Sequence, residues 1–166
     1  MPSGAGCSAP FNRAPDPPVI RIPQPLLTSI MEAAEAAYPL ECCGLLVGRG
    51  EAAGDVRVTR VEPSPNRSEG DRRKSFLVDP KVQFDLMREL DDGPEHIIGN
   101  FHSHPDHPAR PSDHDLQSVF YPEHVWIIVA VDDGRAGEVA AYTFDEKSER
   151  FREIGLAADP TQETPP

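Results

Sequence analysis

The chain has 166 residues with 28 acidic and 16 basic side chains, which gives a formal net charge of −12 at pH 7. This length predicts a single domain with a sizeable core, and the negative charge argues against nucleic acid or an anionic membrane as a partner, because like charges repel. The longest apolar run covers only residues 125–131, far too short to span a membrane. Three irregularly spaced cysteines and an N-terminus without a signal-peptide pattern predict a soluble, cytoplasmic protein.

The order of apolar and polar residues predicts three helices. Apolar residues at helical spacing indicate a first helix over residues 26–38, ended by Pro39. Asp79 and Pro80 open a second helix, since proline is favoured in the first turn, and a short third helix is expected over residues 111–121. The apolar face of the second helix is expected to consist of Val82, Leu86, Met87 and Leu90.

Short apolar or alternating runs predict strands at residues 42–48, 55–63, 75–80, 96–104, 124–131, 138–144 and 150–156. Cys42 and Cys43 at the start of the first run are expected to be buried and inert, one on each side of the sheet. Residues 64–74 form a polar loop of a length that is often functional. The sum is an α/β domain over residues 19–156, with helices packed on a central mixed sheet. Disordered segments are expected on both sides of it, at residues 1–18 and 157–166.

The residue types that bind metals are concentrated between the fourth strand run and the third helix. His102 and His104 are two residues apart at the end of a predicted strand, so both imidazoles face the same side, about 7 Å apart. Asp115 follows eleven residues after His104, in the first turn of the next helix, across a stiff turn with three prolines. Two imidazoles and a carboxylate suit Zn²⁺ and leave a fourth position for water, as catalytic zinc sites do.

The same residues also have simpler interpretations. Ser112 and Asp115 have the spacing of a capping box, in which Ser112 is the N-cap of the third helix. Two histidines near a strand end are often only solvated side chains. His107 and His114 lie in the same stretch and compete as ligands, although His114 points about 100° away from Asp115 on a helix. The joint occurrence of the histidine pair, the fixed gap and the aspartate favours the metal site.

Two segments of the chain together resemble a known family. "HSHP", six residues, Ser112, two residues and Asp115 reproduce the motif of the JAMM (MPN+, Mov34/PAD-type) zinc metalloproteases. Residues 39–48, "PLECCGLLVG", match the upstream pattern P-x-E-x-x-G-L-L-x-G of bacterial and archaeal members. The resemblance covers residues 19–156 and implies a three-layer α-β-α fold of the cytidine-deaminase-like kind.

The resemblance also implies a role for each matching residue. His102, His104 and Asp115 become the ligands of one Zn²⁺ ion, Glu41 the acid/base that handles the proton of the attacking water, and Ser112 a hydrogen-bond donor to the oxyanion. The chemistry of these side chains agrees with the roles, because a carboxylate can move the water's proton to the leaving amine and a hydroxyl can stabilise the negative charge that develops.

The chain looks most like the short, single-domain bacterial members, which are associated with ubiquitin-like sulfur-carrier proteins that end in Gly-Gly. This resemblance implies hydrolysis of the amide bond after that Gly-Gly, with release of cysteine from a carrier–cysteine adduct in cysteine biosynthesis, as in the CysO–cysteine peptidase type. The alternative is an isopeptidase that removes a ubiquitin-like modifier from lysine. A noncatalytic MPN scaffold is remote, since every motif position is filled. A zinc deaminase is disfavoured, because it requires H-x-E and P-C-x-x-C, which the sequence lacks.

Overall fold

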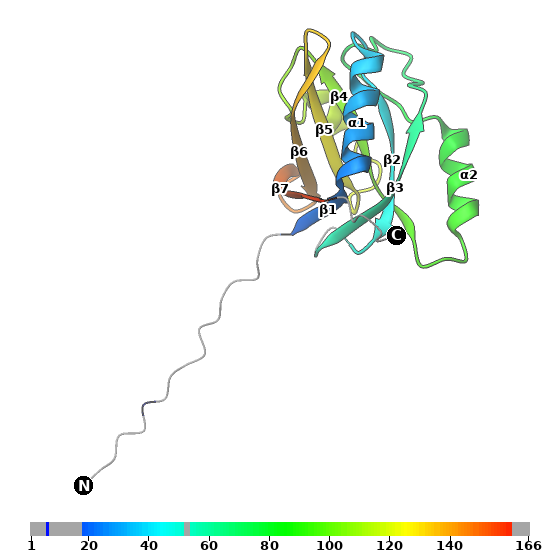
Figure 1. Cartoon of the computed structure of the whole chain (residues 1–166), viewed down its shortest axis with the longest axis vertical. Coiled ribbons are helices and arrows are strands. Elements are labelled where there is room, and N and C mark those ends of the chain that lie inside the picture. The colour runs from blue at the N-terminus through cyan, green and yellow to red at the C-terminus, as the bar shows by residue number, and fades with distance from the viewer. Residues whose placement is uncertain (1–5, 7–17, 52–53, 161–166) are drawn as a thin grey trace, which may run out of the picture.

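The computed structural model of the chain describes residues 6, 18–51 and 54–160. Within these residues the elements follow one another in the order β1 (Val19–Pro23), α1 (Gln24–Ala37), β2 (Cys43–Arg49), β3 (Val56–Ser64), α2 (Pro80–Leu90), β4 (His96–Pro105), α3 (Asp113–Gln117), β5 (Val125–Asp132), β6 (Arg135–Asp145) and β7 (Arg150–Asp159). Figure 1 shows α1 lying across the sheet and α2 standing beside β2 and β3.

The strands form one mixed sheet in the order β1-β3-β2-β4-β5-β6-β7. The neighbours β4 and β5 run parallel, whereas β2 is antiparallel to both β3 and β4. β1 runs parallel to both β3 and β7 and thereby closes the sheet into a barrel. The predicted mixed α/β sheet is confirmed. The sequence did not indicate a strand at Val19–Pro23, which is the element that closes it.

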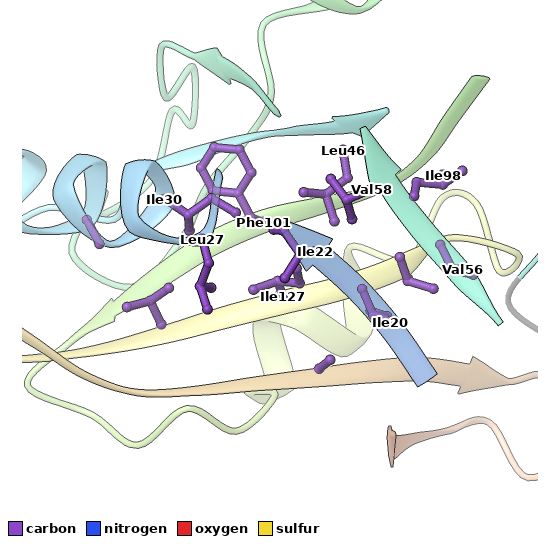
Figure 2. Close-up of a cluster of buried hydrophobic side chains, with 14 of the residues drawn as sticks. Ile20, Ile22, Leu27, Ile30, Leu46, Val56, Val58, Ile98, Phe101 and Ile127 are labelled. Atoms are coloured by element: carbon purple, nitrogen blue, oxygen red, sulfur yellow. The ribbon is translucent and has the colours of Figure 1, made fainter. Parts of the chain in front are cut away.

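The alternation of side chains along β2 divides the core between two faces of the sheet. Leu46 packs into the larger cluster, where Leu27 and Ile30 of α1 point toward Phe101 of β4, as Figure 2 shows. The flanking Leu45 and Val47 point the other way and pack with Leu86 of α2 in a smaller cluster. The two long helices therefore cover opposite faces, and β2 and β4 lie between them.

The structure corrects three sequence predictions. Residues 75–80 are not a strand: 75–79 end a loop over 65–79, and Pro80 begins α2. The loop has a bridge between Asn66 and Val78, but the Asn66 side chain bonds to backbone groups that a strand would need. Met87 is 50% exposed rather than part of the apolar face of α2, since this helix buries only Leu86 against the sheet. β7 continues to Asp159, three residues into the predicted disordered tail, because its second half, residues 155–159, pairs with β1.

The predicted N-terminal disordered segment and residues 161–166 of the tail lie outside the described residues, apart from Gly6 and Pro18. Among the helices of the described residues, none has the length and apolar character needed to cross a membrane.

Candidate metal centre

The three predicted ligands lie together at the carboxyl end of β4. His102 and His104 project from the part of β4 that pairs with β5 in parallel, and Asp115 is in the first turn of α3. One nitrogen or oxygen atom of each lies within 4.8 Å of those of the others. Nε2 of His104 is 3.0 Å from Oδ2 of Asp115, and Nε2 of His102 is 3.2 Å from Oδ1. All three side chains are buried, so bulk water does not compete for these atoms.

A second set of contacts orients the ligands. The Nδ1–H of His104 donates to the backbone carbonyl of Pro108 at 2.9 Å, which leaves Nε2 as the nitrogen with the free lone pair. The backbone N–H of Ser112 donates to Oδ2 of Asp115 at 2.9 Å, and the Asp115 N–H donates to the Ser112 hydroxyl at 3.1 Å. The predicted capping box is therefore present, and it holds the carboxylate toward the histidines. Burial lowers the pKa of His102 and so favours the neutral imidazole that metal binding requires.

The donor set fits a divalent cation. The Nε2 atoms of His102 and His104 face each other at 3.0 Å, and Oδ1 of Asp115 is buried with no hydrogen-bond partner in the part of the chain that the structure describes. Burial alone would raise the pKa of Asp115, but the two imidazoles outweigh it and hold this pKa well below its ordinary value, so the carboxylate is ionised. Two imidazole nitrogens and a carboxylate aimed at one point can hold one metal ion and leave part of its coordination sphere open.

Glu41 reaches the same site from the segment between α1 and β2. Cys43 pairs with His102 in the antiparallel β2–β4 ladder, so Glu41, two residues earlier, lies level with His104. Its side chain is only 4% exposed, and its Oε2 has no hydrogen-bond partner among the described residues. Burial raises the pKa of Glu41 to about 8, although His104 partly lowers it. The structure thus places beside the ligands a carboxyl group whose pKa suits proton transfer near neutral pH.

Several residues around the centre were missed or left open by the sequence. Phe76 stacks on the His102 ring, with 4.3 Å between the ring centroids and 19° between the planes. Trp126 of β5 meets the same ring edge-on at 5.7 Å. A single aromatic residue in a short predicted strand carries no signal of such a contact. His107 and His114, the competing ligands, are exposed and outside the metal-binding group.

Cys42 and Cys43 are buried on opposite faces of the sheet, as predicted. Cys42 packs into the larger core cluster, and Cys43 packs on the other face beside Phe76 and Trp126. Burial raises their pKa values to about 11 and about 12, which favours the neutral thiol.

The fold and this buried His-His-carboxylate group define an α/β protein whose site is able to hold a metal ion. Residues 23–145 match the family model described as prokaryotic homologs of the JAB domain, and the chain belongs to that family. It is 26% identical over 134 residues to the desampylase of Haloferax volcanii, covering 81% of this chain and 89% of that protein. It is 27% identical over 125 residues to the CysO-cysteine peptidase of Mycobacterium tuberculosis, covering 75% and 82%.

The JAB1/MPN domain protein AF2198 from Archaeoglobus fulgidus shares the fold. The two structures superpose with a TM-score of 0.52 over 84% of this chain and 96% of that chain, at 22% sequence identity. The expected JAMM-type fold is confirmed by this likeness and by the family match.

Proposed function

We propose that the protein is a zinc-dependent peptidase that hydrolyses the amide bond after the C-terminal Gly-Gly of a small ubiquitin-like sulfur carrier and releases cysteine from a carrier–cysteine adduct. The observation that carries this proposal is the buried cluster of two imidazoles and one carboxylate with Glu41 beside it. The relative named CysO-cysteine peptidase supports this substrate, and the relative named desampylase supports the alternative, removal of a ubiquitin-like modifier from lysine.

Each residue has a separate chemical task in this proposal. His102, His104 and Asp115 hold the zinc ion. Bound there, zinc supplies Lewis acidity, which brings the pKa of a water molecule close to neutral. Glu41 accepts the proton of the attacking water and returns it to the leaving amine, a task for which its raised pKa is suited. The wall of Phe76 and Trp126 around His102 excludes solvent on one side, which strengthens electrostatic interactions within the centre.

Ser112 carries two tasks that variants can separate. Its hydroxyl oxygen accepts from the Asp115 N–H, and its hydroxyl hydrogen is left to donate to the oxyanion. Ser112→Ala should lose about 1 kcal/mol of stability with the cap, together with turnover. Ser112→Asp should keep the cap and the stability but lose turnover, because it adds negative charge where the oxyanion forms. Thermal melts and initial rates measured on the same samples separate the two effects, and full turnover in Ser112→Asp contradicts the oxyanion role.

We place the reaction in the cytoplasm. Cys42 and Cys43 are adjacent in sequence and both are free thiols buried on opposite faces, which suits a reducing compartment. The strongly negative chain favours a protein or peptide substrate over nucleic acid or an anionic membrane.

The test is the intact mass of a Gly-Gly carrier extended by one cysteine, after incubation with the zinc-loaded enzyme. We expect loss of one cysteine residue with the wild type, and at least a hundredfold slower loss with Glu41→Gln, which keeps zinc. His104→Ala should lose both zinc and turnover, whereas His114→Ala on the exposed side of α3 should keep both. Cleavage of only a lysine-linked conjugate moves the substrate to isopeptides, and cleavage of neither overturns the proposal.

A further inference from the structure

The side chain of Asn66 uses its full hydrogen-bonding capacity inside the loop over residues 65–79. Its Nδ2 donates to the carbonyl of Glu41 at 3.2 Å and to the carbonyl of Ser75 at 2.9 Å. Its Oδ1 accepts from the N–H of Ser68 at 3.0 Å and from the N–H of Leu77 at 3.1 Å. Two donors facing carbonyls and one oxygen facing two N–H groups define the orientation of the amide without ambiguity. Asn66 therefore joins both halves of the loop to the backbone of Glu41.

Glu41 is held by its backbone rather than by its side chain. Its N–H donates to the carbonyl of Arg72 at 2.8 Å, and its carbonyl accepts from Asn66, so both backbone groups bond to the same loop. On the other side, Cys42 exchanges hydrogen bonds with Ser103 of β4, which lies between the two histidine ligands. The carboxylate Oε2 has no partner of its own among the described residues. The direction of this carboxylate thus depends on the hydrogen bonds that hold the Glu41 backbone to the loop.

The loop that grips Glu41 also reaches the metal ligands. Phe76, between Ser75 and Leu77, is the ring that stacks on His102. The two residues next to Phe76 are those whose backbone groups bond to Asn66. The Asn66 side chain therefore bonds both to the backbone of Glu41 and to the two residues that flank Phe76, the ring that stacks on His102.

We infer that Asn66 is a positioning residue for the hydrolysis, which acts by holding the peptide groups of Glu41 so that its carboxylate meets the attacking water. This inference rests on the proposed role of Glu41. Among the described residues the Asn66 side chain bonds to loop groups and to the Glu41 carbonyl, not to the three predicted ligands, so its effect is expected in turnover rather than in substrate affinity. A displacement of about 1 Å at a reacting group costs on the order of a hundredfold in rate. Loss of the hydrogen bond from Asn66 to the Glu41 carbonyl should therefore lower kcat between about tenfold and a hundredfold.

The experiment compares kcat, KM and zinc content for the wild type, Asn66→Ala and Asn66→Asp with the carrier substrate that the wild type cleaves. Asn66→Asp keeps the acceptor for the loop N–H groups and removes both donated bonds, so it should lose as much kcat as Asn66→Ala. KM should stay within about threefold and zinc at one ion per chain. The matched control is Ser75→Ala, which removes two hydroxyl hydrogen bonds of the same loop and leaves the contacts of Glu41 in place. Its kcat should stay within about threefold of the wild type.

A double variant separates positioning from general damage. If Asn66 acts through Glu41, Asn66→Ala added to Glu41→Gln should lower the residual single-turnover rate by no more than about threefold, because the group it positions is already gone. Independent, multiplying effects overturn the inference, as does an equal loss in Ser75→Ala. If Glu41→Gln cleaves as fast as the wild type, the proposed role of Glu41 fails instead, which is a distinguishable result.

Hydrogen exchange gives a readout that needs no substrate. In Asn66→Ala the amide of Glu41, which bonds to Arg72, should exchange at least tenfold faster, while the amide of Ile127 in β5 keeps its rate. Unchanged exchange at Glu41 shows that Asn66 does not hold this segment and overturns the inference regardless of the reaction catalysed.

Discussion

Replacement of Phe76 by alanine should destabilise the protein by about 3 kcal/mol, which is at the low end for a buried phenylalanine. The ring is 8% exposed, stacks on His102 and meets Trp126 edge-on at 6.0 Å. The low end applies because Phe76 also lines a hollow at the surface, beside Tyr121 and Phe120, where water can replace part of the lost ring. For a chain of this length the loss corresponds to a fall in Tm of roughly 6–12 °C.

Urea denaturation of the metal-free protein measures this effect without a contribution from zinc binding. Phe84→Ala in α2 is the matched control, since this ring is 64% exposed and alanine is a better helix former, so its stability should change by no more than about 0.5 kcal/mol. The reasoning is refuted if Phe76→Ala loses less than about 1 kcal/mol, or if both variants lose the same amount, because burial would then not decide the cost.

Three other predictions test separate parts of the structure. Tyr142→Phe should lower the free energy of unfolding by about 1–3 kcal/mol, because the Tyr142 hydroxyl donates at 2.7 Å to the carbonyl of Ala109, which would be left buried and unpaired. An unchanged Tm in a thermal melt contradicts this contact. In a Cys7→Ser chain at pH 8, iodoacetamide should label Cys42 and Cys43 only after urea is added, which intact mass shows. Labelling of the native protein contradicts the burial and the raised pKa values of these two thiols. Zinc at a hundred times its Kd should add about 2.7 kcal/mol of stability, so that a chelator lowers Tm by roughly 5–11 °C, whereas an equal Tm with and without chelator speaks against the metal centre.

The grouping of His102, His104 and Asp115 could be predicted from the sequence because local rules orient each side chain. A strand sends His102 and His104 to one side whatever else the fold does, and a helix N-terminus places Asp115 in the first turn. Only the closeness of the two elements needed a longer-range argument, which the turn with three prolines and the family resemblance supplied.

The surroundings of the site could not be predicted, because they depend on contacts between distant segments. Phe76 stacks on His102 although the two are 26 residues apart in the sequence. The shape of its loop depends on the hydrogen bond from Asn66 to the carbonyl of Glu41. β1 was missed for the same reason: five residues next to a proline-rich stretch carry little periodicity, and only the pairing with β3 and β7 makes Val19–Pro23 a strand. Where a side chain replaces backbone pairing, as at residues 75–80, strand propensity alone gives the wrong result.

The capping box and the candidate metal site, which compete as interpretations of the sequence, share Asp115 in the structure. Oδ2 of Asp115 accepts from the Ser112 N–H and also lies 3.0 Å from the His104 Nε2, while Oδ1 lies 3.2 Å from the His102 Nε2. A carboxylate has enough acceptor positions for both tasks, so the hydrogen bond that starts α3 also fixes the direction of a ligand. The histidines lie on a strand of the barrel and the aspartate lies on a capped helix, so regular secondary structure orients each of the three donors.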